Sequence, residues 1–64
     1  MNVNYPNLKA EMARKGEKLN TLSDLLDLSI SQVSKRMNGQ IEWTLSEIIT
    51  ICDHYGKTFE ELFK

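Results

Sequence analysis

A helix-start motif occurs three times in this chain of 64 residues. In this capping box, a Ser or Thr side chain accepts a hydrogen bond from the backbone three residues later, and a Glu or Gln at that later position returns one. The pattern is present at Ser29 with Gln32, Thr44 with Glu47, and Thr58 with Glu61. No segment shows the regular alternation of polar and apolar residues that is typical of a strand. The sequence therefore predicts an all-α fold.

Apolar residues at helical spacing divide the chain into five short helices. The first starts at Pro6, which suits a first helical turn, and ends before Gly16. The third runs from its cap at Ser29 to the Asn38-Gly39 turn. The second starts between residues 18 and 20 and carries a stripe of leucines: Leu19, Leu22, Leu25 and Leu26.

The last two helices follow the other two capping boxes. The fourth is expected to end at Gly56 and to bury a stripe formed by Leu45, Ile48, Ile49, Cys52 and Tyr55. The fifth is expected to turn its apolar residues inward, namely Phe59, Leu62 and Phe63. A chain of this length has room for one small domain, so we predict a single compact five-helix unit over residues 1–64.

Several classes of protein are disfavoured by what the sequence lacks. Cys52 is the single cysteine, so no internal disulfide is expected, and its spacing from His54 places the two on different helix faces, which argues against a metal site. Ser, His and Asp occur in no arrangement that suggests a catalytic triad, so we expect neither an enzyme nor a cofactor. With no signal peptide and no long apolar run, we expect a cytoplasmic protein without a membrane span.

Charge is unevenly distributed along the chain, although the net charge is only -1. Residues 28–41 contain Lys35 and Arg36 and no acidic residue, whereas acidic residues dominate the segments on either side. The predicted third helix would be braced by the second and would present an outward face of Ile30, Ser31, Gln32, Ser34, Lys35 and Arg36. Such a helix fits the major groove of DNA, where a carboxylate would be repelled by phosphate.

This sequence resembles the lambda-repressor-like, Cro-type helix-turn-helix proteins, also called the XRE family, especially the regulators of phages and mobile elements. The most specific stretch runs from Leu28 to Gly39, and Thr44 to Ile48 is similar to the start of the family's fourth helix. The resemblance implies a sequence-specific double-stranded DNA-binding transcriptional regulator, a repressor or Cro-like protein, whose recognition helix spans about residues 30–37. Asp27 stands where the family usually has Gly, and Gln40 where it often has Lys, which suggests modest affinity.

The resemblance also assigns roles to individual residues. Ile30 and Ser31 would face base edges, and Lys35 would reach guanine or phosphate. Gln32 has two possible uses, because its carboxamide can pair with adenine or can serve the capping box. Contacts to the DNA backbone, which set register rather than sequence, would come from Ser29, Arg36, Asn38, Gln40 and Thr44.

One short recognition helix touches too few base pairs to find a single site in a genome, so we expect a homodimer on a pseudo-palindromic operator. Ile51, at the edge of the fourth helix's apolar stripe, and Phe63, near the end of the chain, are the candidates for the dimer interface. The alternative is a protein-interaction module, such as an antitoxin or adaptor, that keeps the helix-turn-helix fold. No small-molecule ligand is evident from the sequence.

Overall fold

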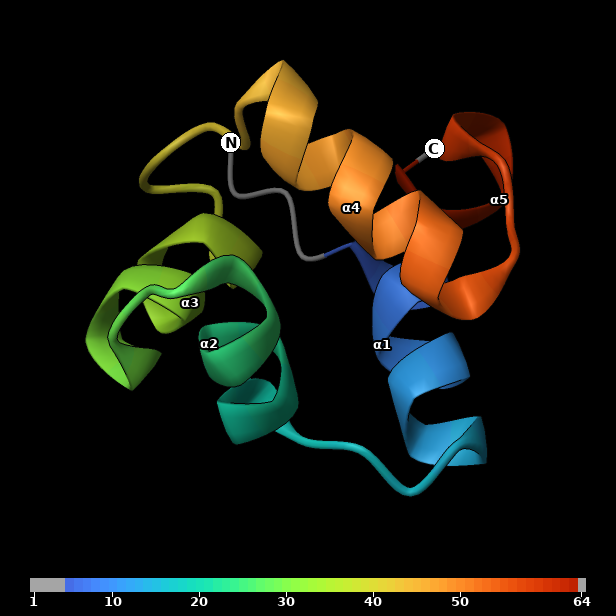
Figure 1. Ribbon diagram of the computed structural model, residues 1–64, viewed down its shortest axis with the longest axis horizontal. Helices are drawn as coiled ribbons and strands as arrows, with labels where there is room; N and C mark the ends of the chain where they lie inside the picture. Colours follow the sequence, from blue (N-terminus) through green and yellow to red (C-terminus); the bar gives the residue numbers. More distant parts are fainter. Residues whose placement is uncertain (1–4, 64) are drawn as a thin grey trace.

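The computed structural model describes residues 5–63 and folds them into helices without any strand. The five helices are α1 (Pro6–Arg14), α2 (Leu19–Leu26), α3 (Ile30–Met37), α4 (Leu45–Tyr55) and α5 (Phe59–Phe63). Figure 1 shows α2 and α3 together on one side of the molecule and α5 on the other, with α4 running between them. Helix α2 packs on α3 and α4, while α5 packs on α1 and α4. This arrangement confirms the all-α five-helix fold.

Two of the three capping boxes close completely. At the start of α4, Thr44 Oγ1 accepts from the Glu47 N–H at 3.2 Å, and Glu47 Oε1 accepts from the Thr44 N–H at 3.0 Å. The same pair of bonds joins Thr58 and Glu61 at 3.2 and 2.9 Å before α5. At α3, Ser29 Oγ accepts from the backbone N–H of residue 32 at 3.1 Å, but the side chain there does not return the bond. Helix α3 therefore starts at the predicted cap, but only the backbone bond of its capping box forms.

The turn between α2 and α3 holds these two helices together. Asp27 occupies the left-handed region, with φ of 56° and ψ of 44°, which costs about 1 kcal/mol for a residue that is not glycine. The Leu28 N–H donates to the Ser23 carbonyl at 3.0 Å, and the Ser23 hydroxyl donates in return to the Leu28 carbonyl. Because these bonds span the turn, α2 braces α3 from its last turn.

The core draws side chains from every helix. Its buried residues are Leu8, Met12, Leu22, Val33, Met37, Trp43, Ile51, Tyr55 and Leu62. On α3 the two buried positions, Val33 and Met37, lie one turn apart, so this helix contributes one narrow stripe and leaves the rest of its surface outside the core.

Some of the expected burial is wrong. Leu45, Ile49 and Phe59 are 74%, 52% and 43% exposed, whereas Ile51 is completely buried. The reason lies in the face that α4 turns toward the core: it is centred on Ile51 and Tyr55, so Leu45 and Ile49, one turn apart, fall outside it. Ile51 therefore cannot serve as a surface residue for a partner. No helix in residues 5–63 is long and apolar enough to cross a membrane.

Candidate nucleic-acid interface

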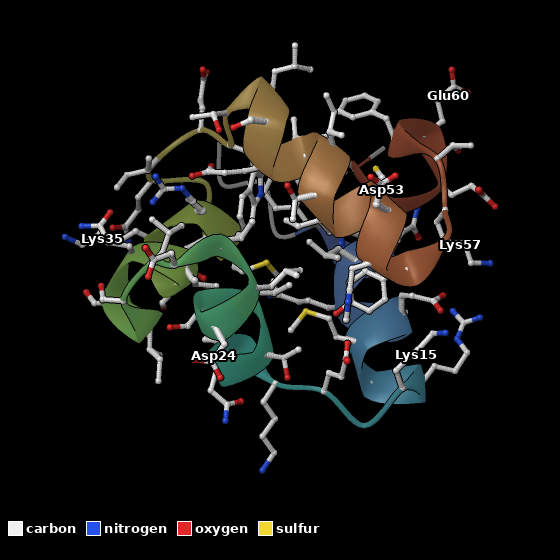
Figure 2. All side chains as sticks on the ribbon, viewed as in Figure 1. Lys15, Asp24, Lys35, Asp53, Lys57 and Glu60 are labelled. Atoms are coloured by element: carbon white, nitrogen blue, oxygen red, sulfur yellow. The ribbon has the colours of Figure 1, made fainter. Side chains whose placement is uncertain are left out.

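Helix α3 presents a polar surface on the side opposite its buried stripe. Ser31 and Lys35 are exposed there and stand one turn apart. Ile30 lies on the same side of the helix as Val33 and Met37, but it is exposed because it is the first residue of α3. Figure 2 shows Lys35 extending away from the body of the molecule at one end, far from Lys57 at the other. A flat or grooved anionic partner can approach this surface without displacing any core residue.

The predicted backbone-contact positions lie around the two ends of the same helix. Ser29, at the start of α3, is exposed while its hydroxyl holds the helix N-terminus. Asn38 and Gln40, just after α3, and Thr44, the cap of α4, are exposed as well. Ser34 is half-buried. The structure thus places the predicted DNA-contact residues around one helix, but Gln32, Ser34 and Arg36 are half-buried rather than exposed.

Arg36 departs most from its predicted position, because it does not project outward as expected. Its side chain is only 11% exposed and lies against α4, where Nε donates to Glu47 Oε1 at 3.1 Å. Its Nη1 donates to the Gln32 carbonyl at 3.2 Å and to Gln32 Oε1 at 3.1 Å. The guanidinium is therefore used within the molecule, and Lys35 is the cation of α3 that extends into solvent.

Glu47 brings a carboxylate to the flank of a helix that has none of its own. The same oxygen, Oε1, accepts from the Thr44 N–H and from Arg36 Nε. Burial opposes ionisation of this carboxyl, but the bond from Thr44 and the pairing with Arg36 outweigh it and lower its pKa below the ordinary value. Glu47 thus stays ionised and neutralises Arg36 rather than repelling a nucleic acid.

The orientation of the Gln32 carboxamide follows from its partner. An arginine side chain carries only donors, so the group facing Arg36 Nη1 must be the carboxamide oxygen. The amide nitrogen then lies on the other branch of the carboxamide, and none of the described residues accepts a hydrogen bond from it. The sequence predicts two possible uses of the Gln32 side chain, pairing with adenine or completing the capping box with Ser29. The structure lacks the capping-box bond from this side chain.

Comparison with protein families assigns this helical unit. The BetR domain matches residues 6–64, which is nearly the entire chain. The chain belongs to the BetR domain family. BetR domains are small, helical, helix-turn-helix-like DNA-binding domains with a regulatory role, so DNA is the partner to which this fold is suited. No curated protein and no solved structure matches the chain.

Other reactive groups of this BetR domain are engaged in its structure. Burial raises the pKa of the Cys52 thiol, with a further contribution from Asp53, so this side chain is not a reactive thiolate. His54 Nε2 on α4 lies 3.0 Å from Glu17 Oε2, so this pair connects the loop after α1 to α4. Within residues 5–63, no three His, Cys, Asp or Glu side chains are grouped so as to hold a metal ion.

Sequence reasoning missed two functional features of the BetR domain, and both depend on contacts between helices. Glu47 was interpreted as a cap of its own helix, although it also pairs with α3. The sequence prediction places Arg36 on the outward face of the acid-free third helix, and the resemblance assigns it to the DNA backbone. The available signal was helical spacing: Arg36 is adjacent to the buried Met37 and one turn from Gln32, on the flank of the helix rather than on its outer face.

Proposed function

We propose that this protein is a sequence-specific regulator of transcription, a repressor or Cro-like protein without catalytic activity, that places α3 in the major groove of double-stranded DNA. The observation that supports this is the exposed surface of α3. Ile30, Ser31 and Lys35 are exposed on a helix that contains no acidic residue. Ser31 offers a hydrogen-bonding hydroxyl, and Ile30 suits an apolar feature such as a thymine methyl. DNA as the partner agrees with the cytoplasmic location expected from the sequence.

Contacts to phosphate would hold the helix in the groove. Ser29 precedes α3, Asn38 and Gln40 follow it, and Thr44 opens α4, so these polar groups flank the reading face on both sides. Lys35 provides the charge that releases counterions. Because Arg36 is neutralised by Glu47, the electrostatic part of binding is small and affinity depends strongly on salt-independent contacts.

The test is the salt dependence of binding by a Lys35→Ala variant. Loss of one phosphate contact should weaken binding to every duplex and reduce the slope of log affinity against log salt by about 0.9. Lys57→Ala is the matched control, because Figure 2 places Lys57 at the opposite end of the molecule, and it should leave the slope unchanged. If Lys35→Ala has no effect on affinity or slope, α3 is not the DNA surface and the protein-interaction alternative is favoured.

We also propose that the protein binds its operator as a homodimer. Ile49 on α4 and Phe59 on α5 are exposed apolar side chains, and Phe63, one turn from Phe59, is half-buried and stacks on it with ring centroids 5.6 Å apart. These side chains replace the buried Ile51 as candidates for the interface. Pairing two copies would make binding of the second half-site effectively intramolecular, with half-sites about 34 Å apart.

Sedimentation and selection of bound DNA test the dimer together. We expect two chains per operator, two-fold symmetry in the selected sequences, and weaker operator binding by an Ile49→Glu variant that keeps its helical content. One chain per bound site, with no symmetry in the selected DNA, would exclude this arrangement.

A further inference from the structure

Arg36 and Glu47 form a link between α4 and the side chain of Gln32 on α3. The link has three hydrogen bonds in series: the Thr44 N–H to Glu47 Oε1 at 3.0 Å, Arg36 Nε to the same oxygen at 3.1 Å, and Arg36 Nη1 to Gln32 Oε1 at 3.1 Å. It begins at the rigid start of one helix and ends at a carboxamide on the helix proposed to enter DNA.

We propose that Arg36, fixed by Glu47, positions the Gln32 carboxamide so that its amide hydrogens select guanine in the major groove. This inference rests on the proposed function, because it requires α3 to face the bases. Arg36 is accordingly a positioning residue, and Gln32 is the residue that contacts the base.

The choice of base follows from which half of the carboxamide is already bonded. A glutamine that reads adenine uses both halves, since its oxygen accepts from N6 and its nitrogen donates to N7. In this protein the oxygen is turned to Arg36 Nη1, which takes one of its two lone pairs, whereas neither of the two NH2 donors has a partner among residues 5–63. Guanine presents two acceptors in the major groove, N7 and O6, and so complements a group that only donates.

Arg36 is well suited to hold this orientation because it is itself constrained at both ends. Its side chain is 11% exposed and that of Glu47 is 14% exposed, so water competes weakly for their hydrogen bonds. A second bond from Nη1 to the Gln32 carbonyl, at 3.2 Å, keeps the guanidinium over the same turn of α3. These bonds use three of the five N–H donors of the guanidinium and leave the two on Nη2.

The experiment compares the sequences selected from random duplex DNA by the wild type, Gln32→Ala, Arg36→Met and the variant carrying both changes. We expect the wild type to select guanine at one position of each half-site and Gln32→Ala to lose this preference by about tenfold. Arg36→Met should lose it at the same position, and the double variant should lose no more than either single one. Glu47→Gln is a second variant, expected to relax the same position should Arg36→Met prove too unstable to study.

Lys35→Ala separates failure of this inference from failure of the proposed function. If α3 reads DNA but Arg36 only binds phosphate, Arg36→Met will weaken all duplexes, reduce the salt slope by about 0.9 as Lys35→Ala does, and leave the base preference intact. That result overturns the inference alone, as would selection of adenine at the position controlled by Gln32. If the wild type selects no sequence and Lys35→Ala changes nothing, the proposed function fails and this inference falls with it.

Discussion

Helices α3 and α4 begin with the same capping-box pattern but form different side-chain hydrogen bonds. Both have a hydroxyl cap that accepts from the backbone three residues on, Ser29 at 3.1 Å and Thr44 at 3.2 Å. In α4 the side chain at that third position, Glu47, returns to its cap, whereas in α3 the side chain of Gln32 turns to Arg36 instead. The bond from the backbone N–H to the cap hydroxyl therefore forms in both helices. The bond from the side chain at the third position back to the cap depends on which other groups that side chain can contact.

Charge explains the difference. The ionised Glu47 oxygen attracts the Thr44 N–H and the Arg36 guanidinium at once, and it holds both. The neutral carboxamide of Gln32 has only its oxygen to offer, and a charged donor one turn away on the same helix is a stronger partner for it than a backbone N–H. Arg36 therefore stabilises Glu47 in the capping box of α4 and draws the Gln32 side chain away from the capping box of α3.

The largest effect is expected from removing the charge of Glu47. Glu47→Gln keeps an acceptor for Thr44 but leaves the largely covered Arg36 without a charged partner, which should lower the free energy of unfolding by about 1 to 3 kcal/mol. Urea unfolding measures this loss. Glu61→Gln is the matched control, because it changes the same box position in α5, where no arginine is paired; an equal loss there would show that Arg36 adds nothing.

Acid should reproduce part of that loss. Because folding lowers the pKa of Glu47, its contribution is fully present above the ordinary value of 4.5 and declines as the pH falls through the lower, folded value. The difference in unfolding free energy between wild type and Glu47→Gln should therefore shrink as the pH falls below that ordinary value, while the α3 box does not titrate. A difference that stays constant with pH would rule out an ionic role for Glu47.

The two caps themselves should be equivalent. Ser29→Ala and Thr44→Ala each remove one bond to a helix N-terminus, and each should cost about 1 kcal/mol in urea unfolding. Similar values would place the asymmetry between α3 and α4 in the side chains at the third position. A much larger loss for Ser29→Ala would show that α3 depends on its cap more than the geometry implies.

The smallest effect is expected from making the α3 box resemble that of α4. Gln32→Glu offers Arg36 a second carboxylate at i,i+4 spacing and should raise the free energy of unfolding by about 0.3 kcal/mol. Its effect on DNA should be opposite and larger, because an acceptor replaces the amide donors and adds a negative charge near phosphate. Unchanged DNA binding by this variant would mean that Gln32 lies outside the interface.

Features set within a few residues were predictable from the sequence. The starts of α3, α4 and α5 depend on Ser29, Thr44 and Thr58, whose bonds reach only three residues along the chain. The left-handed turn at Asp27 is local in the same sense. The five helices and their order were therefore correctly predicted.

Features set by docking of one helix on another were not predictable in the same way. The apolar stripe predicted for α4 includes Ile49 and leaves Ile51 at its edge, but the packing of α4 on α2 and α5 buries Ile51 and leaves Ile49 exposed. Likewise, counting charges by segment assigned Arg36 and Glu47 to different segments. The two residues are 11 positions apart in the sequence, but their side chains are in contact. Pattern and resemblance predict the DNA-contact residues around α3, whereas the pairing of Arg36 with Glu47 is visible only in the folded structure.

The bond from Arg36 to Glu47 also bears on how such a domain is rebuilt or diversified. A graft of residues 29–38 into another scaffold would carry Gln32 and Arg36 but leave behind Glu47 and its anchor Thr44, which belong to the next helix. The transplanted helix would keep its sequence and lose the restraint on its side chains. A graft that preserves these contacts therefore needs α3 together with the first turn of α4. If α3 reads DNA as proposed, substitutions in that turn will change base preference without any change in α3 itself.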